Sequence, residues 1–122
     1  MMRSFLVLVS LIGLSAALVA NASGQRAAVP TLNGTVGPSF TITLKQNGKV
    51  VKTLKAGTYK FVIADRSSIH AYALDGPHGF AKDFTSVPFT GTKTVTLKLK
   101  AGSYKYYCPP HEAIMAAHFK VT

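Results

Sequence analysis

The sequence predicts a single all-β domain, an antiparallel β-sandwich, behind a cleaved signal peptide. Three observations lead to this prediction. The chain has 122 residues, which is enough for one compact domain. Apolar and polar side chains alternate with a period of two in several short segments, as they do in half-buried strands. Turn-forming residues separate these segments, and about seven short strands joined by turns are typical of a two-sheet sandwich.

The N-terminus has the organisation of a secretory signal. Arg3 precedes an apolar run over residues 5–20, and small residues follow up to a cleavage position after Ala22. A membrane anchor is the alternative, but the run is interrupted and falls short of the roughly 20 apolar residues that a spanning helix needs. We therefore expect a secreted or periplasmic protein with no stable membrane insertion after cleavage. The predicted divisions are a signal peptide at 1–22, a flexible lead-in at 23–30 and the folded domain at 31–122.

Within the domain, alternating segments and turn signals divide the chain into strands and connections. Phe40 to Lys45 alternates, and Asn47-Gly48 then favours a tight hairpin turn. Further strands are expected at 50–54, 59–63, 94–100, 104–108 and 119–122. Connections are expected at 65–68, at 75–79 and over the irregular stretch 83–92, while 112–117 is the best helical candidate but is too short to be stable alone.

One segment of the sequence is repeated. Residues 54–61 read Leu-Lys-Ala-Gly-Thr-Tyr-Lys-Phe, and residues 99–106 read Leu-Lys-Ala-Gly-Ser-Tyr-Lys-Tyr. Two copies are too few for a solenoid. We therefore expect two equivalent units, each a turn followed by a strand, on the two facing sheets.

The exported part of the chain is strongly basic. Removing residues 1–22 takes away one cation, Arg3, and no acid, so the net charge falls from +10 to +9. A field of this sign favours acidic partners and affects encounter rates rather than the fold. The lysines mostly alternate singly with apolar residues, as on solvated strand faces, and the clustered arginines and stacked exposed aromatics of nucleic-acid sites are lacking in the sequence. We therefore expect no specific nucleic-acid partner.

Cys108 is the only cysteine, so an intramolecular disulfide is excluded. The alternatives are an intermolecular bridge, an inert buried thiol or a metal ligand. Tyr104, Tyr106 and Cys108 share one face of a predicted strand, so the thiol is expected to point inward. Pro109-Pro110 ends this strand and returns the chain towards the sulfur at His111.

The spacing Cys-x2-His-x3-Met, formed by Cys108, His111 and Met115, favours copper. A soft thiolate, an imidazole and a thioether suit both oxidation states of copper, whereas zinc more often takes a second Cys or His and rarely takes Met. A blue-copper site needs one more histidine, and His70, in a loop after a core strand, is the natural donor. His78 lies in a Gly/Pro turn, and His118 alternates with the apolar Phe119.

These residues resemble the type 1 (blue) copper proteins, or cupredoxins, of the plastocyanin-like kind. The resemblance covers 31–122 and rests on Tyr106 to His111 with Met115, on the strand around Phe119, and on the segment from Asp65 to His70. It implies a Greek-key sandwich with one copper at one end and one-electron transfer between partner proteins. It also implies that His70, Cys108 and His111 are equatorial ligands and Met115 is a weak axial one. Pro110 would remove an amide donor from the thiolate, which favours Cu(I) and raises the potential.

The sequence also departs from the plastocyanin pattern. Ala71 stands where an asparagine usually ties the two ligand loops together, and Ala117 stands where a glycine is frequent. The spacing from His111 to Met115 is one residue shorter than in typical plastocyanins. We expect these differences to affect the rigidity and potential of the site rather than the choice of metal. The acidic patch of plant plastocyanins has no counterpart, so a photosynthetic partner is not implied.

The expected function is that of a monomeric electron carrier rather than an enzyme. A multicopper oxidase needs several more histidines, and four acidic residues offer no paired-carboxylate site. The lysines would steer a redox partner that has an acidic docking surface, and the electron would leave through the edge of His111 or through Tyr107 beside the thiol. The alternatives are a copper storage or delivery protein and a metal-free binding module of the same fold.

Overall fold

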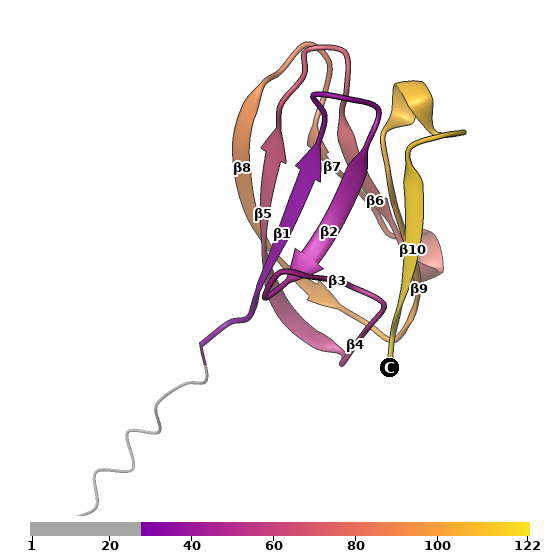
Figure 1. Ribbon diagram of the computed structural model, residues 1–122. Helices are drawn as coiled ribbons and strands as arrows, with labels where there is room; N and C mark the ends of the chain where they lie inside the picture. Colours follow the sequence, from indigo (N-terminus) through magenta and orange to yellow (C-terminus); the bar gives the residue numbers. More distant parts are fainter. Residues whose placement is uncertain (1–27) are drawn as a thin grey trace, which may run out of the picture.

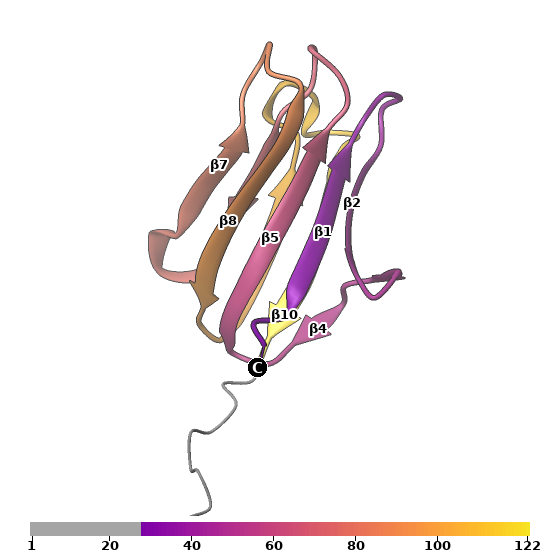
Figure 2. The ribbon, with the colours of Figure 1, turned by 90° about the vertical axis from the view of Figure 1, so that its left-hand side faces the viewer.

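Two five-stranded sheets face each other and form a β-sandwich (Figures 1 and 2). The computed structural model describes residues 28–122, and the predicted signal peptide with most of the lead-in lies outside the described residues. The strands are β1 (Thr31–Val36), β2 (Ile42–Gln46), β3 (Lys49–Val50), β4 (Thr53–Leu54), β5 (Gly57–Asp65), β6 (Tyr72–Asp75), β7 (Ala81–Thr85), β8 (Gly91–Leu99), β9 (Gly102–Tyr107) and β10 (Ala116–Val121). Two short 3-10 turns, η1 (Pro77–Gly79) and η2 (Pro109–His111), are the only helical elements between 28 and 122. The predicted all-β sandwich is confirmed.

The strand order explains how segments far apart in the sequence become neighbours. One sheet has the order β3-β2-β1-β5-β8, and the other has the order β4-β10-β9-β6-β7. The chain crosses repeatedly between the sheets, as expected for the Greek-key sandwich. Strand β8 forms one edge of its sheet and pairs with β5 along its whole length. None of the helical turns between 28 and 122 has the length or apolarity to cross a membrane.

The core lies between the sheets and is rich in aromatic side chains. In β5, Tyr59, Phe61 and Ile63 are buried while the residues between them are more exposed. In β9, Tyr104 and Tyr106 are buried in the same alternating way. This alternation is the period-two pattern that the sequence predicts.

The repeated segment folds in the same way in both sheets. The Tyr59 hydroxyl donates to the carbonyl oxygen of Lys55, and the Tyr104 hydroxyl donates to that of Lys100, both at 2.7 Å. Each bond closes the turn before a strand, β5 in one sheet and β9 in the other. The expectation of two equivalent turn-then-strand units is confirmed.

Several predicted boundaries are wrong. The strand expected at 50–54 is split, because β3 pairs with β2 while β4 crosses over to pair with β10. The stretch 83–92 is not irregular throughout, since 81–85 forms β7 and β8 begins at Gly91. The strand expected at 119–122 begins earlier, so that two residues of the helical candidate 112–117 belong to β10. In each case, pairing with a neighbouring strand outweighs the local pattern.

Four connections gather at one end of the sandwich, at the top of Figure 1. They are β1–β2, β5–β6, β7–β8 and the loop from β9 to β10 that contains η2. The register places Val36 beside Asp65 and Asp65 beside Gly91, so three of these loops leave from the same level. This end of the fold holds the predicted metal ligands.

Candidate metal centre

The predicted ligands lie in two loops at this end of the sandwich. His70 lies near the end of the connection between β5 and β6, and Cys108 directly follows β9. His111 and Met115 lie in the loop that joins β9 to β10. His70, Cys108 and Met115 are buried, and His111 is half-buried. The fold thus joins two distant segments at a buried position with one partly open edge.

The donor atoms of His70, Cys108 and His111 form a compact triangle. The two Nδ1 atoms are 3.1 Å apart, and Cys108 Sγ lies 3.8 Å from the Nδ1 of His70 and 3.6 Å from that of His111. The point equidistant from the three atoms lies about 2.0 Å from each, close to the ~2.0–2.3 Å bonds that such ligands make to a zinc-sized ion. These three residues are therefore already positioned to hold one metal ion.

A hydrogen bond on the far side of the ring fixes the orientation of His70. Its Nε2 lies 3.1 Å from the carbonyl oxygen of Ser39. A carbonyl oxygen can only accept, so Nε2 carries the proton, and in the neutral ring Nδ1 presents its lone pair to the other two donors. Metal-binding histidines are commonly oriented by such a partner.

Backbone hydrogen bonds close the loop from Cys108 to Met115. The amide of Cys108 donates to the carbonyl of Met115 at 3.0 Å, and the amide of Met115 donates to the carbonyl of His111 at 2.9 Å. The amide of His111 donates to the carbonyl of Cys108, also at 2.9 Å. Pro109 and Pro110 begin η2, where their fixed φ angles restrict the turn further. The three loop residues are therefore held in one arrangement.

The two ligand loops are tied together by the backbone of Ala71. Its amide donates to Cys108 Sγ at 3.4 Å. The next amide, that of Tyr72, donates to Oγ1 of Thr85 at 2.9 Å, which anchors the same segment to β7. The asparagine side chain that the resemblance suggested at position 71 is absent, but the amide supplies a link that does not depend on the side chain there.

Comparison with known protein families places the chain among copper proteins. The copper binding proteins of the plastocyanin/azurin family match residues 41–122. The chain belongs to this family. Its cofactor is therefore copper, and its class of activity is electron carriage rather than catalysis.

Solved structures of similar fold agree with this assignment. Reduced rusticyanin is 21% identical, with a TM-score of 0.54, over 80% of this chain and 81% of that one. A reduced variant of amicyanin is 15% identical, with a TM-score of 0.51, over 80% of this chain and 87% of that one. At these identities the likeness concerns the fold alone. No curated protein matches the chain.

Copper fits the donor set of this cupredoxin. One thiolate and two imidazoles in a trigonal arrangement suit copper, whereas structural zinc sites normally use four tetrahedral Cys or His ligands. Copper bound there would alternate between Cu(I) and Cu(II). His70, Cys108 and His111 bring their donors together from a rigid frame, and burial keeps water away from two of them.

Phe40 covers both histidines, and the sequence analysis missed it. Its ring centroid lies 5.1 Å from that of His70 and 5.0 Å from that of His111, with both contacts edge-to-face. The expected strand 40–45 begins only at Ile42, so Phe40 lies in the preceding turn, where its side chain is 51% exposed. Gly37 makes this turn possible because its φ of +73° is left-handed. Gly37-Pro38 is a turn-forming pair, and it could have indicated that the strand begins after Phe40.

A polar cluster surrounds Tyr107 on the outer face beside Cys108. The Tyr107 hydroxyl donates to Asp75 Oδ1 at 3.3 Å, and Lys105 Nζ lies 4.5 Å from the Tyr107 ring centroid while it pairs with Glu112. Desolvation raises the pKa of Tyr107, and the Asp75 carboxylate raises it further. The hydrogen bond that Lys105 donates to the Glu112 carboxylate raises the pKa of Lys105. At neutral pH Tyr107 is therefore uncharged and Lys105 is protonated.

The other two histidines lie outside the centre, as the sequence analysis expected. His78 lies in η1, and His118 lies on β10 opposite Lys105. Both are exposed. Among residues 28–122, the only group of three or more His, Cys, Asp or Glu side chains positioned for a metal ion is His70, Cys108 and His111.

Proposed function

We propose that this protein carries single electrons between partner proteins through one type 1 copper bound by His70, Cys108, His111 and, more weakly, Met115. The triangle of two imidazole nitrogens and one sulfur carries the proposal, since this trigonal set with a weak thioether is typical of electron-transfer copper. Met115 is supported as the fourth ligand by its burial and by its two backbone bonds within the ligand loop. A rigid site rearranges little between oxidation states, which favours fast exchange.

The half-buried edge of His111 is the proposed point of electron exit. Exposed apolar side chains lie in the four loops around it, namely Phe40, Ile69, Val87 and Ile114. Apolar side chains gathered at one end of a soluble protein indicate a contact surface for another protein. Tyr107, beside Cys108 on the outer face, is a second possible route. We propose that the redox partner contacts this end transiently.

The charge and the N-terminal signal support the remaining parts of the proposal. The net charge of +9 after removal of 1–22 would attract a partner with an acidic docking surface. The signal-like segment supports action in a secreted or periplasmic location. We propose that the domain works there as a monomer.

Addition of Cu(II) to the purified protein tests the ligand set. We expect an intense blue thiolate-to-copper band that is lost in Cys108→Ser and kept in the control His118→Ala, whose side chain lies outside the centre. A protein that stays colourless, or colour that survives in Cys108→Ser, would contradict the proposal.

Two further measurements separate electron transfer from storage or delivery of copper. A carrier should show a reversible one-electron couple and fast electron self-exchange, whereas a storage protein need show neither. Met115→Leu should keep the blue band and change the potential. An unchanged potential in Met115→Leu would remove Met115 from the ligand set while leaving the other three ligands in place.

A further inference from the structure

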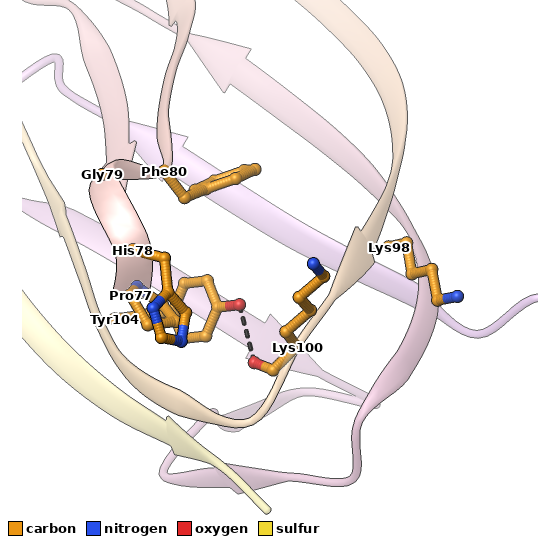
Figure 3. Close-up of a pocket in the computed structure, with 7 residues that line it drawn as sticks. All are labelled: Pro77, His78, Gly79, Phe80, Lys98, Lys100 and Tyr104. Atoms are coloured by element: carbon orange, nitrogen blue, oxygen red, sulfur yellow. Dashed lines mark hydrogen bonds between the residues drawn. The ribbon is translucent and has the colours of Figure 1, made fainter.

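A pocket lies beside the turn between β8 and β9, away from the loops that hold the metal centre (Figure 3). Its volume is about 240 Å³, and its walls are η1 with Phe80, the last part of β8 with Lys100, and Tyr104 of β9. Tyr104 lies four residues before Cys108, which is about 13 Å along an extended strand. The pocket is therefore separate from the metal centre.

The walls of the pocket are largely apolar rings. Phe80 and Tyr104 meet edge-to-face with their centroids 6.0 Å apart, and the ring of Pro77 lies beside them. The Tyr104 hydroxyl is occupied, because it donates to the carbonyl oxygen of Lys100. Tyr104 is buried and stacks on Phe119, so a ligand would meet mainly the half-buried Phe80 ring and Pro77. These apolar surfaces suit a flat apolar group rather than a hydrated ion alone.

The charged side chains that line the pocket are both cations, Lys98 and Lys100. Neither forms an ion pair among residues 28–122, where the one ion pair joins Lys105 to Glu112. Asp75, two residues before η1, is the nearest acid in sequence to the pocket wall. It accepts a hydrogen bond from Tyr107 and does not pair with either lysine. The lining thus contains two lysines that form no ion pair within the described part of the chain and contains no acid, and the Lys98 side chain points away from the Phe80 and Tyr104 rings (Figure 3).

Close backbone packing holds the pocket in shape. A Cβ on Gly76 would lie 2.5 Å from the Tyr104 ring, and one on Gly102 would lie 2.6 Å from the Pro77 ring. The turn is closed by the amide of Gly76, which donates to the carbonyl of Phe80 at 2.8 Å. His78, in the middle of η1, has a left-handed φ of 57°, a conformation that few residues other than glycine adopt. A strained turn fixed against a strand is a preorganised wall, and such strain is common at binding sites.

We propose that this pocket binds a small carboxylate carrying one planar ring, an aromatic acid in the simplest case. Phe80 and Pro77 would contact the ring, and the positive charge of Lys100, with a longer-range contribution from Lys98, would attract the carboxylate. A volume of about 240 Å³ is enough for one ring. Because pocket and copper are separate, this site is independent of the proposed electron transfer.

The internal repeat supplies a matched control. Lys55 occupies the place of Lys100 in the first copy, and Tyr59 closes that turn as Tyr104 closes the second. None of the residues that line the pocket belongs to the first copy of the repeat, because η1 packs beside the second copy only. Lys55→Gln therefore removes the same charge from the same kind of turn without touching the pocket.

Titration of the copper(I)-loaded protein with benzoate, followed by NMR, tests the proposal. We expect saturable shifts at Phe80 and Tyr104 with a millimolar dissociation constant, since a ligand of about nine non-hydrogen atoms has only a small binding free energy. Acetate, which lacks the ring, and benzylamine, which has the opposite charge, should bind at least about tenfold more weakly. The double variant Lys98→Gln/Lys100→Gln should weaken benzoate about fivefold or more, the scale expected for two solvent-exposed charges.

Three results would overturn the proposal. They are the absence of saturable shifts at Phe80 and Tyr104, equal binding of benzylamine and benzoate, and an effect of Lys55→Gln as large as that of the double variant Lys98→Gln/Lys100→Gln. Phe80→Leu tests the ring wall separately and should weaken benzoate while leaving acetate unchanged. The copper absorption of the oxidised protein should not change with benzoate, and a change would indicate binding at the metal instead.

Discussion

Three contacts fix His70 and the loop that carries it. The carbonyl of Ser39 accepts its Nε2 proton, the ring of Phe40 packs against its edge, and the amide of Ala71 next to it reaches the sulfur of Cys108. The first contact sets the rotation of the ring, the second restricts water, and the third sets the separation of the two loops. A metal site that is rigid in this way keeps one geometry in both oxidation states.

Phe40→Ala should lower the reduction potential and speed the loss of copper. Without the ring, water reaches the edges of both histidines and stabilises the more highly charged Cu(II) state. We expect a decrease of tens of millivolts, since about 1 kcal/mol corresponds to roughly 40 mV for one electron. Voltammetry of the variant measures the shift.

Ile69→Ala is the matched control for Phe40→Ala. Ile69 is as exposed as Phe40, at 51%, and lies in a neighbouring loop. Equal potentials in the two variants would show that the ring contacts of Phe40 have no role in tuning the copper.

Tyr72→Phe should make stability less sensitive to alkaline pH. The Tyr72 hydroxyl donates to the carbonyl of Thr43 at 2.9 Å, and burial raises its pKa well above the usual value, with a smaller contribution from Tyr106. The folded state therefore keeps the proton while the unfolded state loses it above about pH 10, so the free energy of unfolding falls as the pH rises beyond that point. The variant should lose about 1 kcal/mol at pH 7 with the hydrogen bond.

Urea unfolding of Tyr72→Phe and the parent protein at pH 7 and pH 11 measures both effects. The difference in the free energy of unfolding between the parent protein and Tyr72→Phe should shrink or reverse at pH 11. A constant difference across this range would show that Tyr72 does not govern the alkaline loss.

The proposed ligands stand out in the sequence, but their surroundings do not. Cys108, His111 and Met115 lie close together in the sequence, and strand phase alone turns Cys108 inward with Tyr104 and Tyr106. Phe40 and Ser39 reach His70 from 30 or so residues away through the pairing of β1, β2 and β5, which no local pattern encodes. The pocket at η1 could not be predicted from the sequence either, because its walls come from elements of both sheets.

At the scale of single elements, β1 shows how closely the sheets approach. Gly34 is buried in the middle of this strand, and a Cβ there would collide with Ile63 and lie 2.9 Å from the Tyr72 ring. Glycine is therefore required for packing, although its φ is ordinary. The neighbouring Asn33 points to solvent.

Gly34→Ala should destabilise the fold by about 1–3 kcal/mol, the usual cost of overpacking a core. Asn33→Ala is the control and should change the free energy of unfolding by no more than about 0.5 kcal/mol. Urea unfolding at neutral pH measures both. A Gly34→Ala protein as stable as its control would mean that β1 shifts to make room.

Three strands were missed by the sequence patterns, and two of them, β6 and β7, share one property. β6 is buried on both sides at Tyr72 to Leu74, and β7 has its buried residues together at Phe84 and Thr85, so neither strand alternates. Both are strands because they pair with each other and because β6 also pairs with β9. Alternation identifies half-buried strands such as β5 and β9 and fails for these.

At the scale of the whole molecule, one sheet face carries lysines without exposed acids, whereas the other sheet carries charges of both signs. The register places Lys45, Lys60 and Lys98 on the outer face of the sheet that contains β1, among threonines. The acid in the strands of that sheet, Asp65, is buried, whereas Asp75 and Asp83 lie in the other sheet and Glu112 in the ligand loop. The copper end itself is mainly apolar, so charge acts on the approach of a partner more than on the final contact.

The rate of electron exchange should therefore depend on salt with a sign set by the partner. Reduction of an anionic metal complex should slow as ionic strength rises, because the Debye length shrinks to about 10 Å at 0.1 M. Reaction with a cationic complex should become faster. The triple variant with glutamine at Lys45, Lys60 and Lys98 should reduce both slopes, as stopped-flow kinetics would measure, and equal slopes in variant and parent would assign steering to other charges.

Strand β8 leaves one row of backbone amides and carbonyls open to solvent, since it is the last strand of its sheet. A long exposed edge of this kind is a template on which a second copy of the chain can add by strand pairing. Lys93 and Lys98 lie along this edge, and an antiparallel copy would bring their charges close to those of the neighbour. The positive charge that is proposed to attract a partner would thus also oppose pairing of this open edge with a second copy of the chain.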